Sequence, residues 1–180
     1  MNHAKRWIIG IVLVGLAVTG IAGMARSTVA AALPDDIADL LLEALVGPDG
    51  EYAAYAAYQA VLDEYGDVEP YATIAAAELR HIQSLQRQLD KYGIDYPSTN
   101  PYLGKIEAPA SLEEAAAAWV DGEVANVAMY DELLEQVRSY PDLYRVFSNL
   151  RRASLEKHLP AFELAAENGG VSPVSMSTSL

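Results

Sequence analysis

Apolar positions recur with a helical period along most of the chain, and no segment of useful length alternates between polar and apolar residues as a strand does. Glycine and proline mark the ends of the periodic segments, because glycine caps a helix C-terminus and proline fits the first helical turn. The pattern predicts an all-α fold. Helices are expected at residues 36–45, 51–65, 70–92, 111–138 and 141–168.

The longest interruption of this pattern lies at residues 93–110. A connection of that length in a compact domain usually carries function or crosses a distance. Ser111 and Glu114 then form a capping box that starts the next helix. Two helical hairpins joined by one long crossover predict an antiparallel four-helix bundle over residues 35–169. Residues 170–180 are expected to form a disordered tail.

The first part of the chain has the pattern of a targeting segment. Lys5 and Arg6 precede an uncharged apolar run at residues 7–24, and Arg26 and small residues follow. Residues 1–31 are therefore predicted to be a signal peptide or an N-terminal membrane anchor helix, because the run also reaches the lower limit for a spanning helix. Both interpretations place the bundle outside the cytoplasm, secreted or periplasmic or anchored facing outward. Residues 7–24 would make the contact if the chain associates with a membrane.

The charge balance narrows the class of partner. The net charge is −13, and the chain after its first 30 residues has nine basic and 25 acidic residues. Such a surface repels phosphates, so no nucleic-acid partner is expected. The chain has no cysteine, which excludes thiolate metal sites and disulfides. The sequence leaves open whether the chain forms a homo-oligomer.

Several polar side chains fall on helix faces that are otherwise apolar. Glu78 shares its face with Ile74 and Ile82, and His81 lies one turn further along that face. The same is true of three more residues, one on each of the other bundle helices: Glu51, Glu123 and His158. An isolated buried carboxylate is costly enough to take up a proton instead. A divalent cation would compensate the whole group, so these five residues are the predicted metal ligands.

Five segments form a series that is specific as a whole: EYAAYAAYQAVLDEYG at 51–66, TIAAAELRHI at 73–82, KIEAPASLEEA at 105–115, GEVANVAMYDELL at 122–134 and VFSNLRRASLEKHLPAF at 146–162. The series resembles the ferritin-like superfamily and, more narrowly, the bacterial and archaeal domain family DUF2202, over about residues 39–167. The resemblance implies a ferritin-like bundle. In such bundles, glutamates of the first and third helices join a Glu-x-x-His of the second and fourth helices to hold two ions of iron or manganese.

The last helix departs from this family pattern. Leu155 stands three residues before His158, and Glu156 would point about 160° away from that histidine on an ideal helix. Pro160 is expected to distort the turn, because it cannot donate to the carbonyl of Glu156. Five of six expected ligands are present, and Asn126 is a candidate for the missing oxygen. The sequence therefore leaves open whether each chain binds one or two ions of iron or manganese.

Tyrosines gather near two of the predicted ligands: Tyr52, Tyr55 and Tyr58 near Glu51, and Tyr130 after Glu123. We favour core packing with a hydroxyl that reaches a carboxylate over a redox-active phenol beside iron.

The leader and the resemblance together lead to the hypothesis of an exported metal-binding protein, whose site would oxidise ferrous iron or consume peroxide. Non-catalytic metal sequestration and a metal-free structural or interaction bundle are the alternatives. Whether the chain is an enzyme stays open.

Overall fold

A computed structural model of the chain describes residues 32–173, and all regular secondary-structure elements of this part are helices, as the periodicity predicts. The predicted leader, residues 1–31, and residues 174–180 lie outside the described part. The last predicted helix is divided by a short π-helical turn. The elements are α1 (Asp35–Val46), α2 (Glu51–Tyr65), α3 (Tyr71–Tyr92), α4 (Leu112–Gln136), α5 (Pro141–Ala153), η1 (Ser154–His158) and α6 (Leu159–Glu167).

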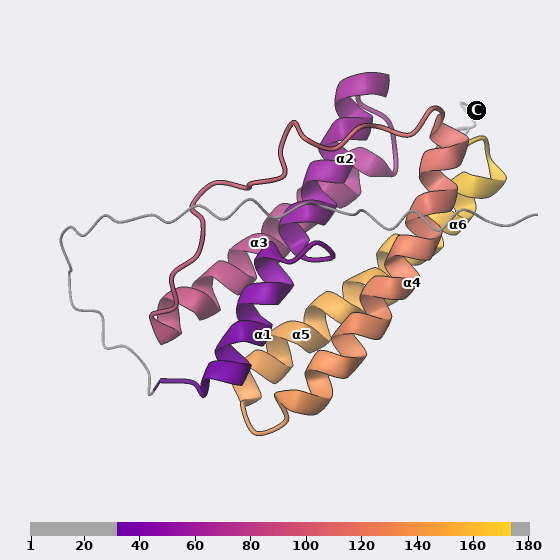
Figure 1. The fold of residues 1–180 in the computed structure, drawn as a ribbon. Helices are drawn as coiled ribbons and strands as arrows, with labels where there is room; N and C mark the ends of the chain where they lie inside the picture. Colours follow the sequence, from indigo (N-terminus) through magenta and orange to yellow (C-terminus); the bar gives the residue numbers. More distant parts are fainter. Residues whose placement is uncertain (1–31, 174–180) are drawn as a thin grey trace, which may run out of the picture.

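The helices form two hairpins that pack into a bundle. α2 packs against α3, and α4 packs against α5, η1 and α6. α1 and α2 follow one another along α3, so the first arm of the bundle is itself broken in two (Figure 1). The connection from α3 to α4 runs the length of the bundle, because α4 begins at the end opposite to the one where α3 stops (Figure 1). The predicted long crossover is therefore observed.

Tyrosine hydroxyls hold this crossover and the turn before α2 in place. Tyr52 donates to the carbonyl of Pro97 at 2.8 Å, and Tyr65 donates to the carbonyl of Pro109 at 2.5 Å. Asn100 donates in turn to the carbonyl of Tyr52 at 2.6 Å. Backbone groups in an irregular segment need partners of this kind wherever the segment lies against the protein. The crossover is thus tied directly to α2.

The chain after α6 is also held against the bundle. Tyr71 donates to the carbonyls of Gly170 and Leu112, at 3.0 and 3.1 Å. Gly170 has a φ of +88°, and a Cβ at this position would lie 2.1 Å from the backbone of Leu112. The backbone of Ser172 donates to the carbonyl of Glu69. Gly170 and Ser172, which the sequence placed in the tail, therefore have defined hydrogen bonds, to Tyr71 of α3 and to Glu69 before it.

Two apolar cores lie along the bundle, and each takes residues from both hairpins. One core centres on Leu41, Leu85 and Phe147, and the other centres on Tyr58 and Phe162. Along α3, Ile74 belongs to the second core and Ile82 to the first, so Glu78 lies between them. A layer of buried polar side chains thus separates the two cores.

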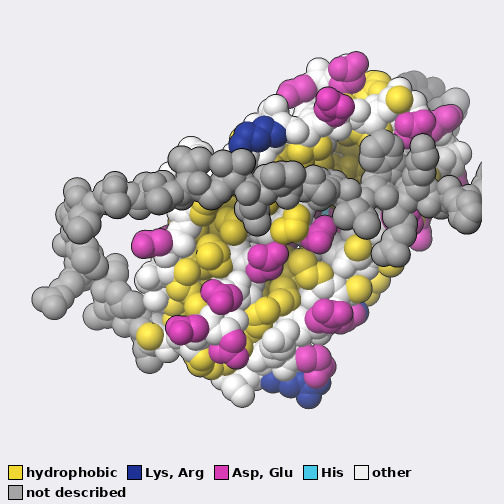
Figure 2. Space-filling view, viewed as in Figure 1, with side chains coloured by type: hydrophobic (Ala, Val, Ile, Leu, Met, Phe, Trp, Pro, Cys, Tyr) yellow, Lys and Arg dark blue, Asp and Glu magenta, His cyan; other side chains and the backbone are white. Residues whose placement is uncertain are grey.

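The surface of the described part is rich in acids. Figure 2 shows Asp and Glu side chains spread across the visible face, with few Lys and Arg side chains among them. Within residues 32–173, no helix combines the length and the apolar character that crossing a membrane requires.

Candidate metal centre

The polar layer between the cores contains the residues that the sequence singles out, together with Ser154. In the described part, the buried polar or charged residues are Glu51, Glu78, Glu123, Ser154 and His158. His81 lies beside them with 12% of its side chain exposed. All five predicted ligands therefore come together at one place, from α2, α3, α4 and η1. We call Glu51, Glu78, His81, Glu123 and His158 the Glu/His cluster.

The cluster consists of two triads that share one carboxylate. Glu51, Glu78 and His81 form the first triad, which we call the Glu51 half. Glu78, Glu123 and His158 form the second, which we call the Glu123 half. In each triad the three candidate ligand atoms all lie within 4.8 Å of one another. That spacing is compatible with one ion in each half.

The two carboxylate oxygens of Glu78 lie near different histidines. Its Oε2 lies 2.8 Å from Nδ1 of His81, and its Oε1 lies 3.1 Å from Nδ1 of His158. Glu51 Oε2 lies 3.4 Å from Nδ1 of His81, and Glu123 Oε1 lies 3.4 Å from Nδ1 of His158. Glu78 is therefore placed to bridge the halves, with one further glutamate and one histidine on each side.

Two tyrosines connect the hairpins through the terminal carboxylates. Tyr58 of α2 donates to Oε1 of Glu123 on α4 at 2.7 Å. Tyr130 of α4 donates to Oε1 of Glu51 on α2. In both helices the tyrosine follows the glutamate by seven residues, or about two turns, so the same local spacing is used twice in opposite directions. The hydroxyls of Tyr58 and Tyr130 thus reach carboxylates, as expected, and each reaches the opposite hairpin, whereas Tyr52 donates to the carbonyl of Pro97 instead.

The cluster nevertheless leaves several buried atoms without a hydrogen-bond partner. In the described part, these atoms include Oε2 of Glu51, Oε2 of Glu123 and Nδ1 of His158. An unsatisfied buried polar atom costs free energy comparable to a lost hydrogen bond, about 1–3 kcal/mol. Since three such atoms face one group of acids and imidazoles, a shared ligand that accepts electron pairs would satisfy them together. A cation fits this requirement.

The electrostatics show how the cluster is balanced when protons are its only cations. Burial raises the pKa of Glu51 to about 8, and the neighbouring Glu78 adds to the rise. Burial opposes a charge on His81, but the carboxylates of Glu51 and Glu78 outweigh it and raise its pKa to about 11. The same competition raises the pKa of His158 to about 9, through Glu123 and Glu78. At neutral pH, Glu51 is therefore uncharged and both histidines carry a positive charge.

Glu78 responds in the opposite direction from Glu51. Burial alone would raise its pKa, but its interactions with the neighbouring Glu51, His158 and His81 side chains lower it below the usual range of a carboxylate. Burial raises the pKa values of Tyr58 and Tyr130 well above the ordinary value, and the adjacent carboxylates add to this. Both phenols consequently stay protonated and act as hydrogen-bond donors to the cluster.

The turn that carries His158 is π-helical. The backbone N–H of Leu159 donates to the carbonyl of Ser154, five residues earlier. Pro160 follows directly and has no N–H to donate to Glu156, so an ordinary α turn cannot close there. The predicted distortion by Pro160 is confirmed. It does not bring Glu156 inward, because that side chain is exposed.

The buried positions of this helix explain why an extra residue is needed. Leu150, Ser154, His158 and Phe162 are all buried, at three successive four-residue steps. In a regular α-helix each such step over-rotates by about 40°, so three steps would turn the last residue about 120° out of the core. A π turn absorbs one residue and keeps His158 and Phe162 facing inward. π turns of this kind are frequent at functional sites.

The π turn also changes which residue lies one turn before His158. The sequence analysis placed Leu155 at the position of the missing carboxylate, but Leu155 is 39% exposed and Ser154 is fully buried. Asn126 donates from Nδ2 to Oγ of Ser154 at 3.0 Å. Ser154 was therefore missed by sequence reasoning. The run of three four-residue steps was the signal that could have revealed it.

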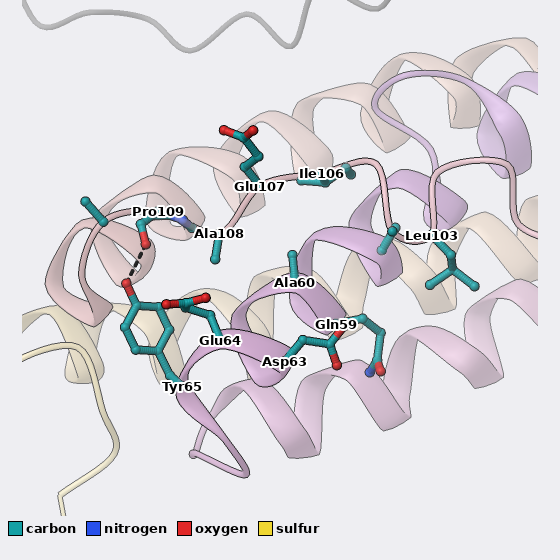
Figure 3. A pocket seen from close by; sticks show the side chains of 13 residues that line it. Gln59, Ala60, Asp63, Glu64, Tyr65, Leu103, Ile106, Glu107, Ala108 and Pro109 are labelled. Atoms are coloured by element: carbon teal, nitrogen blue, oxygen red, sulfur yellow. Dashed lines mark hydrogen bonds between the residues drawn. The ribbon is translucent and has the colours of Figure 1, made fainter.

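A separate pocket of about 670 Å³ lies between α2 and the crossover (Figure 3). Gln59, Asp63 and Glu64 of α2 line one side, and Ile106 and Glu107 of the crossover line the other. None of the cluster residues lines it. The candidate chemistry therefore lies inside the bundle and not in this surface pocket.

The donor set suits a divalent transition metal. Three carboxylates and two imidazoles offer oxygen and nitrogen ligands, which iron, manganese and zinc accept. Glutamates from two helices together with a Glu-x-x-His pair are the side chains that hold paired ions in helical bundles. The cluster is thus a buried Glu/His group able to bind metal, in an all-helical bundle.

Comparison with known proteins adds a fold relationship. The structure is similar to the crystal structure of hypothetical protein MJ0754 from Methanococcus jannaschii DSM 2661, with a TM-score of 0.65 and 19% sequence identity. The similarity covers 84% of this chain and 89% of that one. Identity at this level shows a shared fold alone. No protein-family model matches the sequence, and no characterised protein matches it.

Proposed function

We propose that this chain is a ferritin-like protein of the DUF2202 type that binds two ions of iron or manganese in the Glu/His cluster. The observation that carries the proposal is the pair of triads sharing Glu78, with three buried ligand atoms that lack partners. Glu78 would bridge the ions, while Glu51 with His81 and Glu123 with His158 would complete the two halves. The ordered series of sequence segments supports the same assignment.

The surrounding residues define what this chain contributes to such a centre. Tyr58 and Tyr130 orient Glu123 and Glu51 by donating to one oxygen of each, which leaves the other oxygen for an ion. The two apolar cores exclude water from both ends of the cluster. His81, at 12% exposure, is the member nearest to solvent. Bound iron would supply redox chemistry towards oxygen or peroxide, so ferroxidase or peroxide-consuming activity is the proposed reaction class.

We also propose that the bundle works outside the cytoplasm, either released or held at a membrane by the apolar run of the leader. The basic start and the small residues after that run support this.

The test is elemental analysis of the full-length chain purified without chelator. About two iron or manganese ions per chain are expected, and the Glu78→Ala/His81→Ala double variant should lose both because Glu78 serves both halves. Glu163→Ala, which removes an exposed acid of α6, is the matched control and should keep both ions. Absence of bound metal after anaerobic reconstitution of the unaltered chain would refute the proposal. Oxygen uptake no faster than that of buffer, after loading with ferrous iron, would refute only the enzymatic part.

One observation favours the alternative of a bundle without metal. The cluster is self-neutralised by protons, through ion pairs of His81 with Glu78 at 2.8 Å and of His158 with Glu78 at 3.1 Å. Such a network would hold the hairpins together with no ion. In that case, the double variant should lose the same stability whether or not metal is added. Tight metal binding without turnover would instead support sequestration.

A further inference from the structure

The position that lacks a fourth carboxylate carries a buried hydroxyl. Ser154 is fully buried, and its Oγ accepts a hydrogen bond from Asn126 at 3.0 Å. A serine hydroxyl accepts through its oxygen and still has one hydrogen to donate. A glutamate at this position would bring a negative charge, whereas this serine offers a hydrogen-bond donor to a negatively charged ligand. The substitution thus replaces an anionic ligand by a group that suits a separate anion.

The unsatisfied atoms concentrate on the same side of the cluster. In the Glu123 half, Oε2 of Glu123 and Nδ1 of His158 have no hydrogen-bond partner. In the Glu51 half, only Oε2 of Glu51 is in this state, because His81 is bonded to Glu78 at 2.8 Å. Asn126 lies one turn after Glu123 on α4, and Ser154 lies in the same π turn as His158. The Ser154–Asn126 pair therefore flanks the less complete half.

Charge balance indicates what that half still needs. Two divalent ions would bring four positive charges against the three carboxylates of the cluster. The single excess charge would be buried, and an uncompensated buried charge is strongly unfavourable. One small monoanion cancels it. The side chain of serine is shorter than that of glutamate by about the size of a formate ion, so the replacement also favours a small ligand.

We propose that Ser154 and Asn126 form a binding subsite for one small oxyanion of the carboxylate class, which completes the ligand set in place of a fourth glutamate. This inference rests on the proposed two-ion function. It assigns the anion to the Glu123 half, where Ser154 donates to it and Asn126 holds the serine hydroxyl in position.

The experiment uses Co²⁺ as the ion and formate as the anion. The full-length chain is titrated with Co²⁺ in a sulfonate buffer free of carboxylates and bicarbonate, with and without formate. Equilibrium dialysis gives the stoichiometry and affinity, and visible absorption reports the coordination of Co²⁺. Formate should strengthen binding of the second Co²⁺ at least about tenfold and change the absorption spectrum, because it removes a buried net charge.

Two variants connect this effect to the serine. Ser154→Ala should weaken the formate response about tenfold, the loss expected for one hydrogen bond to a charged ligand. Ser154→Glu should bind the second Co²⁺ without formate, because it supplies its own carboxylate. Ser148→Ala, which removes a half-buried serine of the preceding helix, is the matched control and should respond like the unaltered chain. Asn126→Ala should also reduce the response, because Asn126 holds the serine hydroxyl in position, and circular dichroism checks that each variant is folded.

The outcomes separate this inference from the proposed function. If two Co²⁺ bind and formate alters neither affinity nor spectrum, the anion subsite is refuted and the two-ion centre stands. A formate response of equal size in Ser154→Ala would place the anion elsewhere and also refute the inference. If no Co²⁺ binds at all, the proposed function itself fails.

Discussion

The two halves of the Glu/His cluster use the same kinds of ligand but are held by helices of different regularity. Glu78 and His81 lie three residues apart in α3, which runs for 22 residues without interruption. His158 ends a five-residue π turn between α5 and α6. A regular helix presents residues three apart on one face, so both candidate ligands of α3 reach the cluster. In the π turn the residue before His158 on the inner face is Ser154, so no carboxylate of the same helix accompanies His158.

The halves also differ in burial and in how they hold protons. His81 is 12% exposed, whereas His158 is 2% exposed. Two raised pKa values belong to the Glu51 half, those of Glu51 and His81, and one belongs to His158. Two triads with the same types of candidate ligand therefore differ in exposure and in protonation. The Glu51 half, whose histidine lies in the uninterrupted helix α3, has more groups with a raised pKa and lies nearer to solvent.

The largest expected effect is the pH dependence of metal binding. At pH 7 the metal-free cluster holds protons on Glu51, His81 and His158, and each must leave before its atom can bind an ion. Binding of two ions should therefore release about three protons, and overall affinity should rise up to about a thousandfold per pH unit near pH 7. A pH-stat titration measures the release. Glu123→Gln should bind one ion and release about two protons, and release of fewer than one would contradict the assignment to the Glu51 half.

The next effect is the loss of stability when one histidine is removed from the metal-free bundle. His158→Ala leaves Glu78 and Glu123 buried without their shared partner, which should cost about 3–5 kcal/mol. His81→Ala should cost less, about 1–3 kcal/mol, because water can reach that site. Chemical denaturation in the presence of chelator measures both. Equal losses of stability in the two variants would show that the difference in burial between the two halves does not affect stability.

A smaller effect is the response of the metal-free bundle to alkaline pH. The folded pKa values of His158 and His81, about 9 and 11, exceed the ordinary 6.5, so their stabilisation is complete below pH 6.5 and disappears as pH rises through these values. Glu51, raised from 4.5 to about 8, acts in the same direction from pH 4.5 upward. The unfolding temperature in chelator should fall by at least about 10 °C between pH 7 and pH 10. Circular dichroism measures it, and a flat profile would disagree with the proton-balanced cluster.

The smallest effect concerns the two crossed tyrosines. Tyr58→Phe and Tyr130→Phe each remove a hydroxyl that donates to a carboxyl group of the opposite hairpin. The cost should be about 1–2 kcal/mol each, since one buried acceptor loses its donor while the ring stays in place. Thermal unfolding of the metal-free variants gives the values. Tyr144→Phe, at an exposed tyrosine, is the control and should change little.

Much of the candidate site could be predicted because the signal is local. A glutamate and a histidine at one-turn spacing, flanked by Ile74 and Ile82, mark a polar pair on a buried face without any knowledge of the partner helices. The same reasoning selected Glu51, Glu123 and His158. The all-α class and most helix ends were predictable for the same reason, since caps and breakers act over a few residues. The leader and its role in export stay predictions, because residues 1–31 lie outside the described part.

Ser154 could not be found by the same reasoning, because the analysis assumed a regular helix through residues 141–168. Counting three residues back from His158 led to Leu155, but the π turn makes four residues the inward step. The partners of Tyr58 and Tyr130 were likewise not predictable. Each tyrosine shares a helix with one glutamate and donates to the other, and that choice depends on how the hairpins pack.

The sequence by itself determined the helical class, the inward faces and the five polar residues placed on them, because helical periodicity assigns a face within a single segment. The tertiary structure decided which of these residues meet. Only the packing of α2, α3, α4 and η1 gives Glu78 a histidine at each oxygen and brings Asn126 to Ser154. Distances between helices arise from the fit of whole apolar faces. No local pattern contains them.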